Sequence, residues 1–330
     1  SGTYALYAST TGSYNTASGY YALGSNTTGD RNIAIGYGAY DGADTEDDNL
    51  AIGYDALGGA VAGGEGNVAI GNYSMDANTS GDYNTAVGYA SLGANTNNNY
   101  NTAIGWQSLL NTASGGFNTG LGSRSLESNA SGINNTAVGS NSIFTNSSGD
   151  ENTGVGRNSL YATTGSYNTS LGWYSANEIT SGTYNTVIGH NTSASGATAV
   201  NQTVIGAGAT GQANNSVTLG NADVTAVYAS QDGQATVYTG GLVLEGATAN
   251  AHETTLGVVD PTADATLNLP AMASGTYYVP VLAAASTTSI TSTPAELNIM
   301  DGGTSATSTT IANADRIVLN DDGTMKQVAV

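Results

Sequence analysis

A short pattern of polar and apolar positions recurs along the first two thirds of the chain. Each copy is a five-residue segment that begins with Asn, has an aliphatic residue at its fourth position and ends with Gly. The final Gly of successive copies is spaced by 17 residues almost throughout, with one interval of 18, one of 16 and a last one of 14. A fixed period of this length is typical of stacked repeats. The copies are Asn32–Gly36, Asn49–Gly53, Asn67–Gly71, Asn84–Gly88, Asn101–Gly105, Asn118–Gly122, Asn135–Gly139, Asn152–Gly156, Asn168–Gly172 and Asn185–Gly189.

Each repeat unit contains two strand-like pieces separated by turns. In the first piece alternate positions share a face, so its second and fourth positions, such as Ile33 and Ile35, lie together. The second piece has one apolar position, filled by Leu23 and its equivalents. A segment such as Asn78–Gly81 has turn chemistry, because its Gly can adopt positive φ. No 3.6-residue apolar stripe crosses these turns, so a helical interpretation fails.

The spacing predicts an all-β fold, a parallel β-solenoid or β-roll of about 13 coils with 17-residue repeats. Each coil should hydrogen-bond to the next at about 4.8 Å, giving a rod of roughly 60 Å. Recurring Asn and Thr side chains are expected to stack as ladders along it. We expect one continuous solenoid with parallel strands over residues 1–220, within a shaft domain of residues 1–227.

Beyond the shaft, the period is lost and the chain is expected to form small β-rich modules. The first spans residues 228–290 and the second residues 291–330. In the second, Thr293 can cap a short helix that has Pro294 at its first position and Glu296 closing a capping box. A β-hairpin is expected around Asn320–Gly323, between two apolar runs. Ser1 lies inside a repeat unit, and we expect the fibre to continue beyond Val330.

The small third position of the five-residue segment suggests an assembly. Ordering one 17-residue coil costs about 25 kcal/mol, whereas a coil offers only two or three large apolar side chains, each worth about 2–3 kcal/mol when buried. Ala34, Ala51 and Gly120 occupy the third position and would let a neighbouring coil approach closely. We therefore favour a homotrimer, with three coils packed around an axis, over a single-chain solenoid.

Charge and composition narrow the possible partners. The net charge is −20 with only five Lys and Arg, so the chain has no basic cluster for nucleic-acid phosphates or anionic lipids. It has no Cys for disulfides or thiolate metal sites. We find no apolar run of membrane-spanning length and predict no membrane insertion.

Motifs for catalysis or cofactor binding are weak. Gly206–Gly211 has the G-x-G-x-x-G spacing of a dinucleotide site, but no βαβ unit contains it, and we interpret it as a repeat turn. His190 and His252 are the only histidines, and neither has a second His or a Cys to share a metal. We predict no catalytic residues, no organic cofactor and no enzymatic activity.

An acidic loop is the candidate metal site. Asp41 precedes a run in which four carboxylates crowd together, and carboxylate oxygens are the ligands that Ca²⁺ prefers. The alternative, which we favour, is a solvated acidic loop that keeps fibres apart. The candidate Ca²⁺ ligands are Asp44, Glu46, Asp47 and Asp48.

Aromatic residues recur at two repeat positions. One lies directly after the Gly, and its side chains could stack on the sugar rings of a host glycan. The alternative, which we favour, is packing between equivalent side chains of adjacent strands. The candidate glycan contacts are Tyr20, Tyr37, Tyr54, Tyr89, Trp106 and Trp173; the second position, directly before the Asn, holds Tyr14, Tyr83, Tyr100, Phe117, Tyr167 and Tyr184.

Several segments resemble those of known fibrous proteins. The run Asn214–Gly220 resembles the head repeat of trimeric autotransporter adhesins, a left-handed parallel β-roll, although most units here have 17 residues where that repeat has 14. The 17-residue units, together with Asp260–Pro270, Thr293–Gly302 and Arg316–Val328, resemble segments of bacteriophage tail-fibre and virion structural proteins.

The resemblance implies a structural fibre of a phage virion that supports host-cell attachment. Its partners would then be further copies in a homotrimer, other virion proteins and a host surface glycan, and its location would be extracellular, on the virion. The alternative is a bacterial cell-surface trimeric adhesin or an extracellular filament. A fibre-borne depolymerase is a third, less favoured interpretation.

Overall fold

The computed structural model describes residues 1–42, 44–59 and 64–227, and the strands within 241–244, 254–257, 316–321 and 324–329. These residues are all-β, with no helix among them. They fall into two compact units, Ser1–Val237 and Tyr238–Val330.

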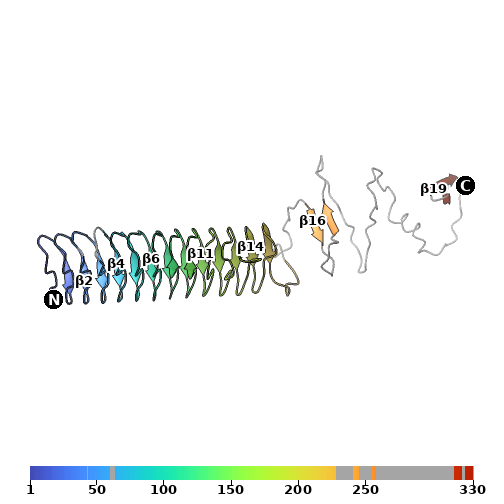
Figure 1. Cartoon of the computed structure of the whole chain (residues 1–330). Helices are drawn as coiled ribbons and strands as arrows, with labels where there is room; N and C mark the ends of the chain where they lie inside the picture. The colour runs from blue at the N-terminus through green and yellow to red at the C-terminus, as the bar shows by residue number, and fades with distance from the viewer. Residues whose placement is uncertain are drawn as a thin grey trace. The chain divides into compact units, whose positions relative to one another are not determined.

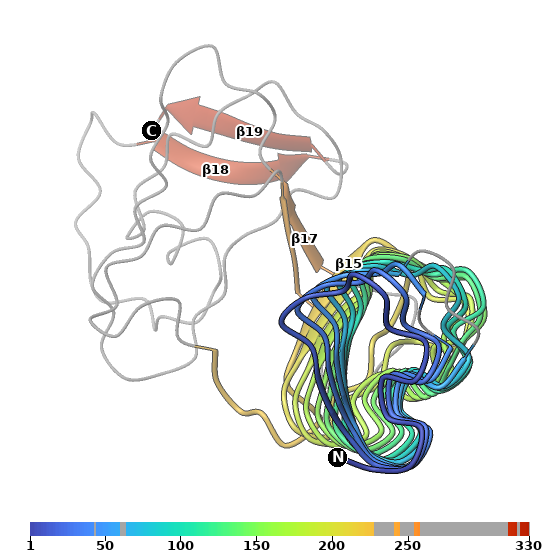
Figure 2. The ribbon, with the colours of Figure 1, turned by 90° about the vertical axis from the view of Figure 1, so that its left-hand side faces the viewer.

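The first unit is a β-solenoid in which every coil contributes one short strand to a 13-stranded parallel sheet (Figure 1). Viewed along the stack, successive coils overlie one another (Figure 2). Strand pairs join equivalent repeat positions, as in Ala34 with Ala51 and Ala51 with Ala69. The predicted parallel solenoid is therefore confirmed. Its strands are β1 (Thr16–Ser18), β2 (Ile33–Ile35), β3 (Leu50–Ile52), β4 (Val68–Ile70), β5 (Thr85–Val87), β6 (Thr102–Ile104), β7 (Thr119–Leu121), β9 (Thr136–Val138), β11 (Thr153–Val155), β12 (Thr169–Leu171), β13 (Thr186–Ile188), β14 (Gln202–Ile205) and β15 (Ser216–Leu219).

The second unit contains two antiparallel strand pairs. β16 (Gly241–Leu244) pairs with β17 (Thr254–Gly257), and β18 (Arg316–Asp321) pairs with β19 (Thr324–Ala329). The β18–β19 pair is the hairpin that the sequence predicts there. The helix predicted to begin at Thr293, and the module boundary near residue 290, lie outside the described residues.

The interior of each coil is narrow, and this corrects the role predicted for the small third position. Ala34, Ala51 and their equivalents are fully buried inside their own coil rather than facing a neighbouring chain. One large side chain per coil, such as Leu109, fills the space opposite. The fit is tightest at Gly154, where a Cβ atom would lie 2.8 Å from Ile143 Cγ1, whereas later coils bury Val187 and Val204 at this position.

The second strand-like piece is a turn in most coils, which corrects the prediction of two strands per coil. Gln107 and Leu109 have φ of 53° and 50°, in the left-handed region that L-residues seldom occupy. Their N–H groups still bond along the axis: Gln107 donates to the Tyr89 carbonyl of the preceding coil and Leu109 to the Ser125 carbonyl of the following coil, both at 2.9 Å. Among the described coils, a second strand forms only at β8 (Ser128–Asn129) and β10 (Thr145–Asn146), a parallel pair.

A ladder of buried asparagines joins the coils, as the recurrence of Asn predicts. The side-chain oxygen of Asn84 accepts the backbone N–H of Asn101 at 2.9 Å, and Asn101 does the same for Asn118 at 3.0 Å. The Asn84 amide nitrogen donates to the Asn98 carbonyl at 2.8 Å. Burying these polar groups is tolerated because each is hydrogen-bonded. A second set of asparagines closes the turns, with Asn78 and Gly81 exchanging two hydrogen bonds of 3.1 Å.

Candidate functional site

The aromatic side chains that follow the Gly form a ladder on the solenoid surface. The rings of Tyr20 and Tyr37 are 5.1 Å apart and nearly parallel, and Tyr37 and Tyr54 repeat this geometry. The next coil has Asn72 at this position, and the ring of Tyr73, one residue later, bridges Tyr54 and Tyr89 through edge contacts of 5.3 and 5.8 Å. Packing between equivalent aromatic side chains, the interpretation favoured from the sequence, is therefore confirmed.

The aromatic side chains before the Asn pack in the same way. Tyr83 stacks on Tyr100 at 5.5 Å, Tyr100 on Phe117 at 5.0 Å and Tyr167 on Tyr184 at 4.8 Å. Where the rings stack, as along Tyr20, Tyr37 and Tyr54, neighbouring rings cover one another's faces. A sugar stacking on a ring needs an uncovered face, so the ladder interiors are less suited to it than positions where a ladder ends.

The two predicted tryptophans lie at such ladder ends. Trp106 is followed one coil later by Ser123, and the guanidinium of Arg124 lies 5.9 Å from its ring. Trp173 stacks on His190 at 4.7 Å. His190 is thus an aromatic ladder member on the surface. The glycan contacts proposed for Tyr20, Tyr37, Tyr54, Tyr89, Trp106 and Trp173 remain predictions, and all six side chains are exposed.

Beside the ladders lies a surface that we call the turn surface, formed by the residues two and five positions after the Gly of each coil. Near the N-terminus it carries Asp41, Asp55 and Asp76, from three successive coils. Burial raises the pKa of all three carboxyl groups, and the charge of Asp55 raises the pKa of Asp41 and of Asp76 further. These carboxylates repel one another.

In the middle of the solenoid an ion pair fills the turn surface. Two nitrogens of Arg124, Nε and Nη2, donate to the carboxylate of Glu127, three residues later, and the Nη2 bond is 3.2 Å long. The guanidinium also lies over the ring of Phe144, 4.5 Å from its centroid.

Further along, the turn surface opens into a shallow pocket of about 390 Å³. Its lining comes from three successive coils and consists of amides and phenol rings. The repeat pattern does not predict this pocket, because the residues at these positions vary from coil to coil. The lining residues are Asn141, Asn158, Tyr161, Tyr174 and Asn177.

The four carboxylates proposed as Ca²⁺ ligands all contact groups of the protein, and Asp47 and Asp48 share Arg31, which lies 3.2 Å from the Asp47 carboxylate. Asp44 accepts the Thr27 hydroxyl, Glu46 accepts the backbone N–H of Asp44 at 2.9 Å, Asp47 accepts the backbone N–H of Asp30 at 2.7 Å, and Asp48 pairs with Arg31 at 2.5 Å. In the described part of the chain, no group of three or more His, Asp or Glu side chains is placed to hold a metal ion. These contacts favour a structural role for the loop, and Ca²⁺ binding remains a prediction.

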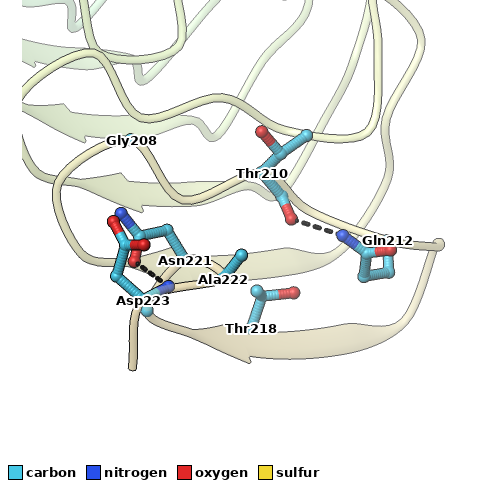
Figure 3. A pocket seen from close by; sticks show the side chains of 8 residues that line it. Gly208, Thr210, Gln212, Thr218, Asn221, Ala222 and Asp223 are labelled. Carbon is cyan, nitrogen blue, oxygen red and sulfur yellow. Dashed lines mark hydrogen bonds between the residues drawn. The ribbon is translucent and has the colours of Figure 1, made fainter. Parts of the chain in front are cut away.

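A second hollow, of about 500 Å³, lies at the last coil of the solenoid (Figure 3). Gln212 donates to the Thr210 carbonyl at 2.8 Å, and Asn221 accepts the backbone N–H of Asp223 at 3.0 Å. The Gly206–Gly211 segment, which has the spacing of a dinucleotide site, follows β14 here as a turn between coils. Its Gly208 has φ of 62°, as a tight turn requires.

Comparison with known proteins gives no matching family model, curated protein or solved structure. Within the described residues, no helix has the length and hydropathy needed to cross a membrane.

Proposed function

We propose that this chain is the shaft of a structural fibre, specifically a homotrimeric tail fibre of a bacteriophage virion, and that it has no catalytic role. In this proposal the fibre lies outside the cell on the virion, contacts other virion proteins and supports attachment to the host, including contacts with a surface glycan. The observation that carries the structural part is an apolar stripe along the outer face of the 13-stranded sheet.

The stripe arises because strand residues alternate between the interior and the outside. Ala34 points inward, so Ile33 and Ile35 point outward and are 38% and 42% exposed. Side chains equivalent to Ile35 continue it along the sheet, one strand spacing of about 4.8 Å apart, whereas the position of Ile33 holds Thr from β5 to β14. A continuous apolar stripe of this kind marks an interaction surface. Its most exposed members are Ile33, Ile35, Ile104, Leu121, Leu171, Ile205, Val217 and Leu219.

Because the interior of each coil is narrow, association of several copies would add substantially to the stability of the fold. A coil such as that of Leu109 buries one large apolar side chain inside itself, which contributes only about 2–3 kcal/mol. Covering the outward Ile and Val side chains by further copies would add a comparable amount for each coil. A closed cyclic assembly covers the stripe of every copy. Threefold order follows the resemblance of the last coil to the autotransporter head repeat.

The alternative is a bacterial cell-surface adhesin or an extracellular filament built from the same coils. The last coil favours it, because β14 and β15 pair Gln202 with Ser216, an offset of 14 residues, whereas the coils before it are offset by 16 to 18. That short coil contains the Asn214–Gly220 run that resembles the adhesin repeat. The stripe and the assembly that it implies are common to both proposals.

The proposal is tested by the mass of the full chain in solution. Mass photometry should give a particle of three times the 32.9 kDa of one chain. Replacing Ile104 and Leu121 together by Asn makes the stripe polar without touching the interior and should reduce the particle to one chain. The control Ser114→Asn, on an exposed turn, should leave the trimer intact. A folded wild-type monomer would refute the assembly.

A further inference from the structure

We propose that the pocket lined by Asn141, Asn158, Tyr161, Tyr174 and Asn177 binds a neutral saccharide. The site differs from the aromatic ladder considered above, and it lies on turns rather than on the apolar stripe. It therefore does not depend on the proposed assembly.

The first support is an amide of the pocket lining whose nitrogen is free to donate to a ligand. Asn158 is 6% exposed, and its side-chain oxygen accepts the amide of Asn141 at 3.2 Å. Its own amide nitrogen donates no hydrogen bond to any described residue. By contrast, Asn84 and Asn101 of the structural ladder each donate their amide nitrogen to a backbone carbonyl. The Asn158 amide is therefore positioned by its bond to Asn141, and its nitrogen can donate to a ligand acceptor in the pocket.

The second support is an uncovered aromatic face. Tyr161 stacks on Phe144 at 5.0 Å, within 11° of parallel. The equivalent residue of the next coil is Asn177, so this ladder ends at Tyr161, and both residues line the pocket. Tyr174 forms a second aromatic wall and is held by Trp173 at 4.3 Å. Two positioned rings thus border the buried Asn158 amide.

This combination fits a pyranose ring. One face of a pyranose is apolar C–H and packs on a phenol ring, while its hydroxyls lie at the rim as paired donors and acceptors. Asn side chains present both a donor and an acceptor, which matches adjacent hydroxyls. The volume of about 390 Å³ falls within the range of small-ligand sites, which combine aromatic walls with a few placed polar groups.

Charge favours a neutral sugar over an acidic one. The lining has no cationic side chain, and the chain as a whole carries a net charge of −20. This field repels anions from the surface. The carboxylate of a uronic acid would find no positive side chain in the lining to pair with, so we expect acidic sugars to bind more weakly than neutral ones.

The test uses the full chain and saturation-transfer NMR with methyl α-mannoside, methyl β-glucoside and N-acetylglucosamine as neutral probes and glucuronic acid as the acidic probe. At least one neutral probe should receive saturation from tyrosine protons. Tyr161→Ala and Asn177→Ala should each raise its Kd by about tenfold. Tyr184→Ala, which removes an exposed tyrosine of the ladder before the Asn, should leave the Kd unchanged.

Three results would overturn the site. They are no saturation of any neutral probe well above millimolar concentration, binding of glucuronic acid alone, and binding that is lost on Tyr37→Ala but retained in the pocket variants. Asn158→Ala tests the buried amide directly, and the two other pocket variants carry the test if it fails to fold. Particle mass, measured on the same samples, separates a failure of the fibre assembly from a failure of this site.

Discussion

A Cβ atom on Gly105 would lie 2.4 Å from the carbonyl oxygen of Gly122 in the next coil. Gly105 also has φ of 140°, in a region that other residues rarely adopt. Gly105→Ala should therefore lower the free energy of unfolding by about 3 kcal/mol or more, as measured by urea denaturation. Gly93→Ala is the matched control, because its new methyl would lie 3.0 Å from the flexible end of Leu110 and no closer than 3.3 Å to any backbone atom. Equal losses for the two variants would contradict the close-approach argument.

The asparagine ladder should be sensitive to a single deletion. In Asn118→Ala, the buried backbone N–H of Asn135 loses its acceptor, which lies at 2.9 Å in the wild type. The unpaired N–H and the small cavity together should cost about 2–3 kcal/mol of stability. Asn97→Ala, on an exposed turn, should change stability little. A loss below that of the control would mean that water replaces the missing acceptor.

Where a non-glycine residue has positive φ, its replacement by Gly should stabilise the fold. Glu151 has φ of 55° and an exposed side chain, while Gly66 occupies the equivalent position in another coil with φ of 64°. Glu151→Gly removes strain of about 1–2 kcal/mol against a chain-entropy cost of about 0.5–1 kcal/mol. A modest rise in the denaturation midpoint is expected. Thr153→Gly, in strand β11, should lower the midpoint, and the same sign for both would refute the argument.

The three carboxylates of the turn surface predict a pH dependence. Burial and the charge of Asp55 raise the pKa of Asp41 and Asp76 above the ordinary 3.8. Folding therefore favours their protonated forms, so the penalty is absent below pH 3.8 and fully present above the raised pKa values. Asp55→Asn should raise the melting temperature at pH 7 and leave it unchanged near pH 3.5. Asp44 lies outside this trio, so the control Asp44→Asn should not raise the melting temperature at pH 7 selectively over pH 3.5.

The sequence predicts the period and the parallel stacking well, because equivalent side chains at a constant spacing can form ladders only in register. It does not predict which side of the strand faces inward. Ile35 is the more apolar residue, yet Ala34 is buried, because Leu23 and its equivalents come from the turns to fill the interior. Tyr40 takes that place in one coil, where Asn49 bonds its hydroxyl at 2.5 Å. A buried Tyr at this position is not predicted from the repeat, because the equivalent position in most other coils holds an aliphatic side chain such as Leu23.

Neither the left-handed turns nor the pocket could be predicted from the sequence, and the reasons differ. Leu109 is an unfavourable residue for positive φ, so local propensity argues against the conformation that axial hydrogen bonding imposes on it. The pocket depends on which residues become lateral neighbours two and five positions after the Gly. Asn158 and Tyr161 acquire their environment from Asn141 and Asn177 of adjacent coils, and no local pattern indicates such pairs.

The constant register between coils has a consequence for how the length of such a molecule can change. Thr102 pairs with Thr119, and Thr119 with Thr136, in the same geometry. Excising residues 102–118 would place Thr119 where Thr102 stood and restore every rung of the sheet. Duplicating the same stretch would insert one more rung of about 4.8 Å. Length is thus counted in whole repeats, and unequal recombination between repeats would lengthen or shorten the rod without a new folding problem.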